Sequence, residues 1–316
     1  QPVAAWTGVR AATEVGAACP QATTSTEPWA RVGAQSEDCL FLNIWTPSQA
    51  ASKKLPVMFF IHGGSFRAGA GGVPMYDGTA LAKRGAVIVT IHYRLGRLGF
   101  FAHPALTKEN TDGYVGNYGL MDQVEALRWV KRNIAQFGGD PANVTIFGES
   151  AGAVSVQALV ASPEATGLVA KAISQSGGGF TLAPTLKASE AAGESWAAKQ
   201  GLPNATAEQL RAIPTDKIPS LDAGGPMVDG KTVKDSPTKA FIQKEQAAIP
   251  MILGGNSWEA SLGGLESAAR PVLGAAYAAL LEAYKTNPSR AGGEADAIFP
   301  GWGRARSRRA GCRAGH

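Results

Sequence analysis

A serine lies at the centre of the pentapeptide Gly-Glu-Ser-Ala-Gly at residues 148–152. The apolar run before it, residues 144–147, predicts a strand, and the run after it, residues 153–159, predicts a helix. A strand, Gly-x-Ser-x-Gly and a helix together form a turn so sharp that it exposes the serine hydroxyl and requires glycine on both sides. The helix N-terminus favours negative charge beside that hydroxyl. The pattern predicts that Ser150 is a nucleophile; the alternative is a turn of small residues without chemistry.

A serine that accepts an acyl group needs hydrogen-bond donors for the oxyanion that forms. Two glycines, Gly63 and Gly64, follow a predicted strand and would present backbone N–H groups with no side chain in the way. The other donor in this architecture is the N–H of the residue after the nucleophile, here Ala151. These three residues are the candidate oxyanion hole, and the alternative for the glycine pair is an ordinary strand end.

The acid that orients the base should follow the serine in the chain and lie just past a strand. Glu259 fits, because it comes shortly after the apolar run at residues 250–255. Asp229 is the competitor, although Asp followed by Gly is first of all typical of a turn. We favour Glu259.

The general base is harder to find, because the chain has only four histidines. The single histidine after Glu259 is His316, the last residue, and no predicted strand precedes it. Removal of the base costs a serine hydrolase several orders of magnitude in rate, so weak or no activity is expected of the chain as written. The other three histidines, none of which is expected to be the base, are His62, His92 and His103.

The elements that would position these groups are short apolar runs separated by helical patterns. The clearest helix covers residues 120–137, where apolar residues recur every three or four positions before a Gly-Gly pair. Apolar runs flanked by helices favour a mostly parallel sheet that is covered on both faces. Further strands are predicted at residues 40–46, 57–62, 86–92 and 250–255, and shorter helices at residues 189–199 and 206–213.

Together these motifs resemble the type B carboxylesterases, the α/β-hydrolases that include cholinesterases, lipases and bacterial para-nitrobenzyl esterases. The resemblance runs from about residue 6 to about residue 262. Besides the pentapeptide, it rests on CPQ at residues 19–21, SEDCLFLN at 36–43, HGG at 62–64, YRLG at 93–96, NYGLMDQ at 117–123 and FGGDP at 137–141.

The resemblance implies an α/β-hydrolase fold, with a mostly parallel central sheet and helices on both faces, that is incomplete at the C-terminus. It matches Gly63, Gly64 and Ala151 to the oxyanion hole and Glu259 to the acid of the triad, although the neighbours of Glu259 differ from the usual ones. It also implies a disulfide between Cys19 and Cys39, whereas their spacing alone leaves two reduced thiols as the safer choice. A disulfide in turn implies an oxidising compartment, so a secreted or periplasmic protein is expected.

The last sixteen residues differ in composition from the rest of the chain. They contain five arginines and no acid, so residues 1–300 are neutral and the net charge of +5 comes entirely from this tail. We expect a partial hydrolase domain at residues 1–300 and, at residues 301–316, a tail outside the fold that reflects a frameshift or truncation. The alternative is a genuine basic tail. The N-terminus also looks short for the family.

The bulk properties limit the possible partners. No nucleic-acid partner is expected of a neutral body, and the apolar runs are too short to span a bilayer. No metal-ligand cluster or phosphate-binding loop suggests a cofactor, so the expected partner is a small-molecule ester, and the oligomeric state is open. The rival interpretation is a catalytically dead hydrolase fold used for binding, as in neuroligin-like adhesion proteins, although those relatives usually lose the serine that is present here as Ser150.

Overall fold

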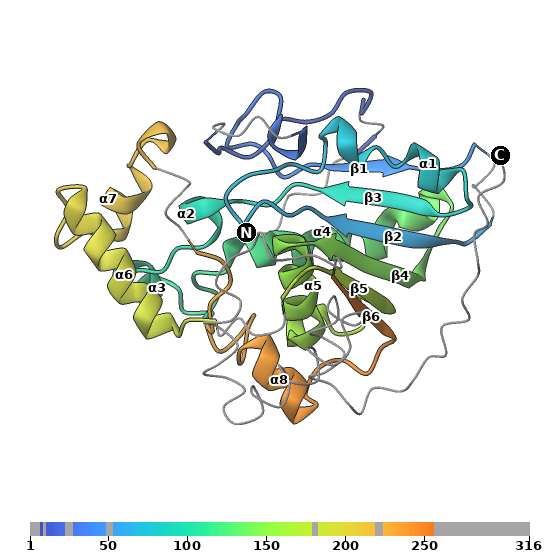
Figure 1. The fold of residues 1–316 in the computed structure, drawn as a ribbon. Coiled ribbons are helices and arrows are strands. Elements are labelled where there is room, and N and C mark those ends of the chain that lie inside the picture. Colours follow the sequence, from blue (N-terminus) through green and yellow to red (C-terminus); the bar gives the residue numbers. More distant parts are fainter. Residues whose placement is uncertain are drawn as a thin grey trace, which may run out of the picture. The chain divides into compact units, whose positions relative to one another are not determined.

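The strands of the computed structural model form one mixed sheet in the order β1-β3-β2-β4-β5-β6 (Figure 1). The structure describes residues 7–8, 11–22, 28–48, 53–178, 183–218 and 224–255, of which those up to Gly254 belong to one compact unit. Among the described strands, only β1 runs antiparallel to its neighbour, β3. The strands are β1 (Leu42–Trp45), β2 (Leu55–Ile61), β3 (Val87–Ile91), β4 (Gly139–Glu149), β5 (Lys171–Gln175) and β6 (Met251–Gly254).

The centre of the sheet is apolar on both faces. All five residues of β3 are buried, and Phe59 of β2 pairs with Val89 of β3 on one side and with Ile146 of β4 on the other. Successive side chains of a strand point to opposite faces, so a fully buried strand must be covered twice. The mostly parallel sheet predicted from the apolar runs is therefore confirmed.

Five of the six strands coincide with predicted runs, and β5 is the exception. Its burial alternates, with Ala172 and Ser174 buried and the two end residues, Lys171 and Gln175, exposed. A strand with so few apolar residues has no run from which it can be predicted. Long-range pairing creates it instead, because it adds to β4 and provides the edge for β6.

Helices follow most of the strands, and the longest is α4 (Tyr118–Asn133), which continues as a 3-10 turn to Phe137 and ends at Gly138 with φ 80°. α4 and α5 (Ala151–Ala161) both pack on β4 and contact each other, so together they cover one face of the sheet. The other helices among the described residues are α1 (Thr79–Ala82), α2 (Gly96–Gly99), α3 (Pro104–Glu109), α6 (Leu186–Lys199), α7 (Ala207–Arg211) and α8 (Pro237–Gln243).

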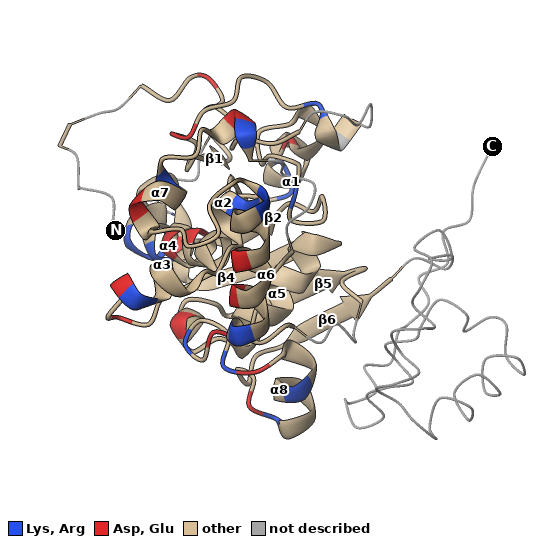
Figure 2. Cartoon of the chain, turned by 90° about the vertical axis from the view of Figure 1, so that its left-hand side faces the viewer, with Lys and Arg blue, Asp and Glu red and all other residues tan. Residues whose placement is uncertain are grey.

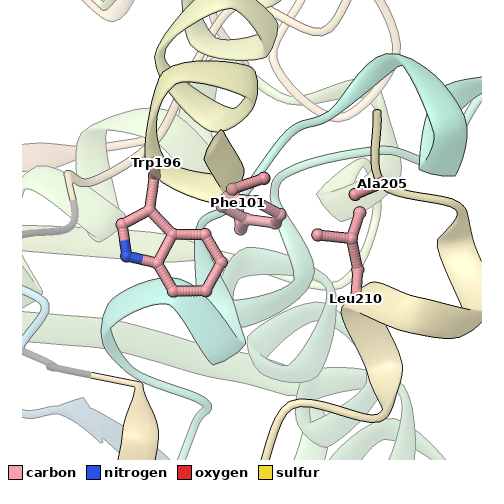
Figure 3. Packing of buried hydrophobic residues seen from close by; sticks show 5 residues of the cluster. Phe101, Trp196, Ala205 and Leu210 are labelled. Carbon is pink, nitrogen blue, oxygen red and sulfur yellow. The ribbon is translucent and has the colours of Figure 1, made fainter. Parts of the chain in front are cut away.

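The α6–α7 segment, residues 186–211, has a small core of its own (Figure 3). Trp196 of α6 meets Phe101 edge-on, with 5.3 Å between the ring centroids, and Leu210 of α7 belongs to the same buried cluster. The guanidinium carbon of Arg97 lies 4.8 Å from the centre of the Trp196 ring. Side chains therefore attach this segment to α2 and to the residues directly after it.

Charged residues of both signs are interspersed over α3, α6 and α7 (Figure 2). One ion pair joins Arg211 of α7 to Glu109 of α3 at 2.7 Å. These helices therefore present a mixed surface rather than a field of one sign.

Candidate active site

Ser150 occupies the turn between β4 and α5, where the chain leaves the carboxyl end of the sheet (Figure 1). Its backbone has φ 55° and ψ −121°, a conformation that is costly for a residue with a side chain. The Ser150 N–H donates to the carbonyl of Gln175 at 2.9 Å, which ties the turn to the end of β5. The strained turn between strand and helix thus has the local form that the sequence predicts.

The two glycines of the pentapeptide lie where no side chain fits. A Cβ on Gly152 would lie 2.0 Å from the carbonyl oxygen of Ile61, at the end of β2. A Cβ on Gly148 would lie 2.6 Å from the carbonyl carbon of Gly152. The start of α5 therefore packs directly on the backbone of the central strand.

Gly63 lies beside the candidate nucleophile. A Cβ on Gly63 would be 2.8 Å from the carbonyl oxygen of Glu149 and 3.2 Å from the Cβ of Ser150. Gly64 follows with φ 99°, in the region that favours glycine. Ala151, the first residue of α5, is buried. The structure thus brings Gly63 and the Ser150–Ala151 step together at one edge of the sheet.

The loop that follows Gly63 turns in an unusual way. Ser65 and Phe66 both have positive φ, at 56° and 59°. The carbonyl of Phe66 accepts a hydrogen bond from the Gly96 N–H at 2.7 Å, and the Phe66 ring packs against Phe100 with 5.0 Å between centroids. Contacts with the chain after β3 therefore hold this loop on one side.

His62 is fully buried at the end of β2. Its Nδ1 lies 2.8 Å from the carbonyl oxygen of Gly63, and its ring stacks on Tyr93 at 4.4 Å. Burial lowers the pKa of His62 to about 3, so the ring is neutral at ordinary pH and is a very weak base. The Tyr93 hydroxyl donates to the His62 carbonyl at 2.9 Å. His62 thus supports the backbone that carries the glycine pair.

The other two described histidines also bond to backbone groups. His92 Nδ1 lies 3.0 Å from the carbonyl oxygen of Ala17 and 3.2 Å from that of Cys39, and burial lowers its pKa. His103 caps α3, accepting a hydrogen bond from the Ala105 N–H at 3.1 Å. Both act as local structural ties.

The structure contains the disulfide between Cys19 and Cys39 that the resemblance implies. Asp229 forms a turn, as an Asp followed by Gly predicts, because its Oδ1 accepts from the N–H groups of Lys231 and Val233 at 3.0 and 2.8 Å. Glu259 and His316 lie outside the described residues, as does the tail at residues 301–316. The predicted acid therefore stays a prediction.

Among residues with a described position, no three or more His, Cys, Asp or Glu residues are grouped so that they could hold a metal ion. No helix in the described ranges is both long enough and apolar enough to cross a membrane.

The side chain of Gln21 belongs to this region, although the sequence gives no sign of its contacts. Gln21 bonds through its side chain to the backbone of Gly69, in the loop after Gly63. It is part of the CPQ motif, but a glutamine carries no distinctive chemistry, and only the fold reveals which backbone it meets.

A strand, a strained serine and a helix packed on a central parallel strand define the nucleophile-elbow class of α/β proteins. The model of the carboxylesterase family matches residues 1–279, and the chain belongs to this family. It is 43% identical over 265 residues to the fumonisin B1 esterase of Sphingopyxis macrogoltabida, covering 82% of this chain and 49% of that protein. It is 42% identical over 269 residues to the para-nitrobenzyl esterase of Bacillus subtilis, covering 80% and 54%.

Solved structures agree with this placement. A carboxylesterase of Geobacillus stearothermophilus superimposes with a TM-score of 0.72 at 39% sequence identity, over 90% of this chain and 61% of that one. The α/β-hydrolase fold is therefore shown. The chain spans about half the length of the curated relatives it matches.

Proposed function

We propose that the chain carries the nucleophile and oxyanion hole of a carboxylic ester hydrolase. The Ser150 hydroxyl attacks the carbonyl carbon of an ester, the bond to the alcohol oxygen breaks, and the alcohol leaves with a proton. Water then cleaves the acyl-serine and releases the acid. The N–H groups of Gly63, Gly64 and Ala151 stabilise the oxyanion in both steps.

One observation carries this proposal: the backbone of Gly63 lies against Ser150, with 3.2 Å between a Cβ built on the glycine and that of the serine. An oxyanion hole needs donors within hydrogen-bond range of the atom attached to the nucleophile. A strained serine placed next to a side-chain-free backbone supports this use. The names of the matched esterases support it independently.

The base is the open part of the mechanism. A histidine with a pKa of about 3, as for His62, is too weak a base for work near neutral pH. His92 and His103 use Nδ1 in bonds with the backbone. We infer that none of the three activates Ser150, that Glu259 is the acid of the triad, and that the 316-residue chain turns over slowly by itself.

The test replaces the base from solution. Hydrolysis of p-nitrophenyl acetate by the purified chain is followed with increasing imidazole, with Ser150→Ala under the same conditions as the control for hydrolysis by imidazole itself. We expect a small imidazole-dependent rate in excess of that control, and an acetyl group on Ser150 detectable by mass spectrometry. Identical rates for both proteins, without acetylation, would refute the proposal and favour a binding protein of the same fold.

We also propose a small-molecule ester as the substrate and a secreted or periplasmic location. The first rests on the esterase relatives, and the second on the disulfide, since disulfides persist in oxidising compartments. Non-reducing electrophoresis of protein from the native host would test the location: protein isolated with the two thiols reduced would contradict it.

A further inference from the structure

The side chain of Gln21 forms a pair of hydrogen bonds with one backbone position in the loop after Gly63. Its Nε2 donates to the carbonyl oxygen of Gly69 at 2.9 Å, and its Oε1 accepts from the Gly69 N–H at 2.7 Å. The amide therefore pairs with both polar groups of one residue, as a neighbouring strand would. The two residues are 48 positions apart.

Gly69 is in contact with the start of the loop that it ends. A Cβ on Gly69 would lie 2.6 Å from His62 Nδ1 and 3.0 Å from the carbonyl oxygen of Gly63. Gly69 also has φ 106°, which a residue with a side chain rarely adopts. The backbone of Gly69 therefore lies directly beside the peptide group of Gly63.

The loop between these two glycines needs outside support. Gly64, Ser65 and Phe66 have positive φ in succession, and each of the two that is not glycine costs about 1 kcal/mol or more. Bonds from the N–H groups of Arg67 and Ala68 to the Gly64 carbonyl, at 3.0 and 3.1 Å, close the loop internally. Such a conformation persists only where the surroundings impose it.

Gln21 is itself held in place. Its Nε2 also donates to the carbonyl of Cys19 at 3.0 Å, and its own N–H donates to Gln35 Oε1 at 2.8 Å. Cys19 is linked by the disulfide to Cys39, whose carbonyl lies 3.2 Å from Nδ1 of the buried His92. The amide of Gln21 is thus connected through the disulfide to the end of β3.

From this arrangement we infer that Gln21 is a positioning residue for the oxyanion hole. It acts through Gly69 and holds the loop of residues 63–69 in the conformation that directs the Gly63 N–H toward the carbonyl bound at Ser150. The catalytic part of this inference rests on the proposed function, and the structural part does not.

Hydrogen exchange tests the structural part with the full 316-residue chain. In Gln21→Ala the amides of residues 62–70 are expected to lose about tenfold in protection, the equivalent of one net hydrogen bond. The matched control is Gln209→Ala in α7, which also removes a hydrogen bond between a glutamine side chain and the backbone: Gln209 Oε1 accepts from the Thr206 N–H at 2.9 Å. It should leave residues 62–70 unchanged.

A second variant separates loss of the clamp, the pair of hydrogen bonds between Gln21 and Gly69, from a general loss of stability. An ionised carboxylate at position 21 only accepts, but a protonated one both donates to the Gly69 carbonyl and accepts from its N–H. Protection of residues 62–70 in Gln21→Glu, relative to the parent at each pH, should therefore recover as the pH falls below about 4. The Gln21→Ala deficit should persist at every pH, and no change in exchange for either variant overturns the inference.

Kinetics test the catalytic part. The oxyanion develops only in the transition state, so Gln21→Ala should lower kcat of Ser150-dependent ester hydrolysis severalfold with little change in KM. Faster exchange at residues 62–70 with an unchanged kcat overturns the catalytic role. Absence of any Ser150-dependent hydrolysis in the parent instead contradicts the proposed function, and exchange alone then decides on the clamp.

Discussion

The elbow around Ser150, residues 148–152, and the α6–α7 segment are both anchored to the rest of the fold, the first by backbone contacts and the second mainly by side-chain contacts. At the elbow, backbone meets backbone, as in the bond from the Ser150 N–H to the Gln175 carbonyl and the packing of Gly152 on Ile61. In the α6–α7 segment, apart from the close approach of Gly193 to the Ala102 carbonyl, rings and alkyl chains meet, with Trp196 packed on Phe101 (Figure 3). The first kind of contact leaves no room for a side chain, and the second can be repacked.

The backbone contacts determine how precisely Ser150 is placed, whereas the side-chain contacts determine how stable the α6–α7 segment is. Backbone contacts hold the turn that carries Ser150, the proposed nucleophile, and such a role demands precise placement because a misplacement of about 1 Å can cost about a hundredfold in rate. A side-chain cluster contributes free energy of folding but tolerates small displacements. Changes at the elbow should therefore damage both folding and chemistry, whereas changes in the α6–α7 segment should damage local stability alone.

The largest effect is expected from Gly152→Ala, compared with Gly193→Ala in α6. The two Cβ atoms would meet carbonyl oxygens at nearly the same distance, 2.0 Å from Ile61 and 1.9 Å from Ala102. The first clash displaces the central strand β2 and should destabilise the chain by about 5 kcal/mol or more. The second can be relieved by a movement of α6 and should cost about 1–3 kcal/mol, less the gain in helix propensity of about 1 kcal/mol.

Urea unfolding of both purified variants measures the comparison, with recovery of soluble protein as the guide where Gly152→Ala does not fold. If Gly193→Ala proves the more destabilising of the two, the contrast between the two kinds of anchor is wrong.

Trp196→Ala should come next and remain local. Loss of a buried tryptophan side chain costs about 3–5 kcal/mol, and here it also removes the stacking partner of Arg97. Limited proteolysis within residues 186–211 should become faster, while imidazole-dependent acetylation of Ser150 should stay near the parent rate. A proportional loss of acetylation would show that the segment is coupled to the elbow.

The same contrast explains what could be predicted from sequence. The elbow is encoded locally, because five consecutive residues predict the turn and the flanking apolar runs predict the strand and the helix. Five of the six described strands are likewise predictable, because each contains a local apolar run. β5 cannot be predicted from its sequence because Lys171, Ser174 and Gln175 are polar. It forms a strand through pairing with β4 and β6.

Side-chain anchors are much harder to infer. The helical patterns of α6 and α7 predict two helices, but nothing in them indicates that Trp196 would meet Phe101, 95 positions earlier in the chain. The same is true of Gln21 and Gly69, which are joined by two side-chain bonds that only the fold brings together. The disulfide was implied by resemblance, since spacing alone did not favour it.

Acid should lower the stability of the central sheet, because His62 and His92 are buried at the ends of its strands. The pKa of His62 falls from its ordinary value of 6.5 to about 3, and that of His92 is also lowered, so the unfolded chain binds more protons than the folded one. The stability from this preference is complete above pH 6.5 and is lost as the pH falls toward 3. Each histidine contributes up to about 1.4 kcal/mol per pH unit.

His92→Asn is the informative variant, because an asparagine can still donate to the carbonyls near the disulfide but does not titrate. Urea unfolding at pH 7 and at pH 5 should show a smaller loss of stability for this variant than for the parent. An equal loss would mean that His92 takes no part in the acid response.

The smallest effect is expected in the α6–α7 segment, at the start of α7. Thr206 and Gln209 form a capping box, in which the Thr206 hydroxyl accepts from the Gln209 N–H at 3.2 Å and the Gln209 side chain accepts from the Thr206 N–H. Thr206→Ala should cost about 1 kcal/mol. Since Leu210 joins α7 to the cluster around Trp196, the loss should appear as faster exchange across both helices and leave residues 62–70 unchanged. Faster exchange in α7 alone would show that the two helices do not open as one unit.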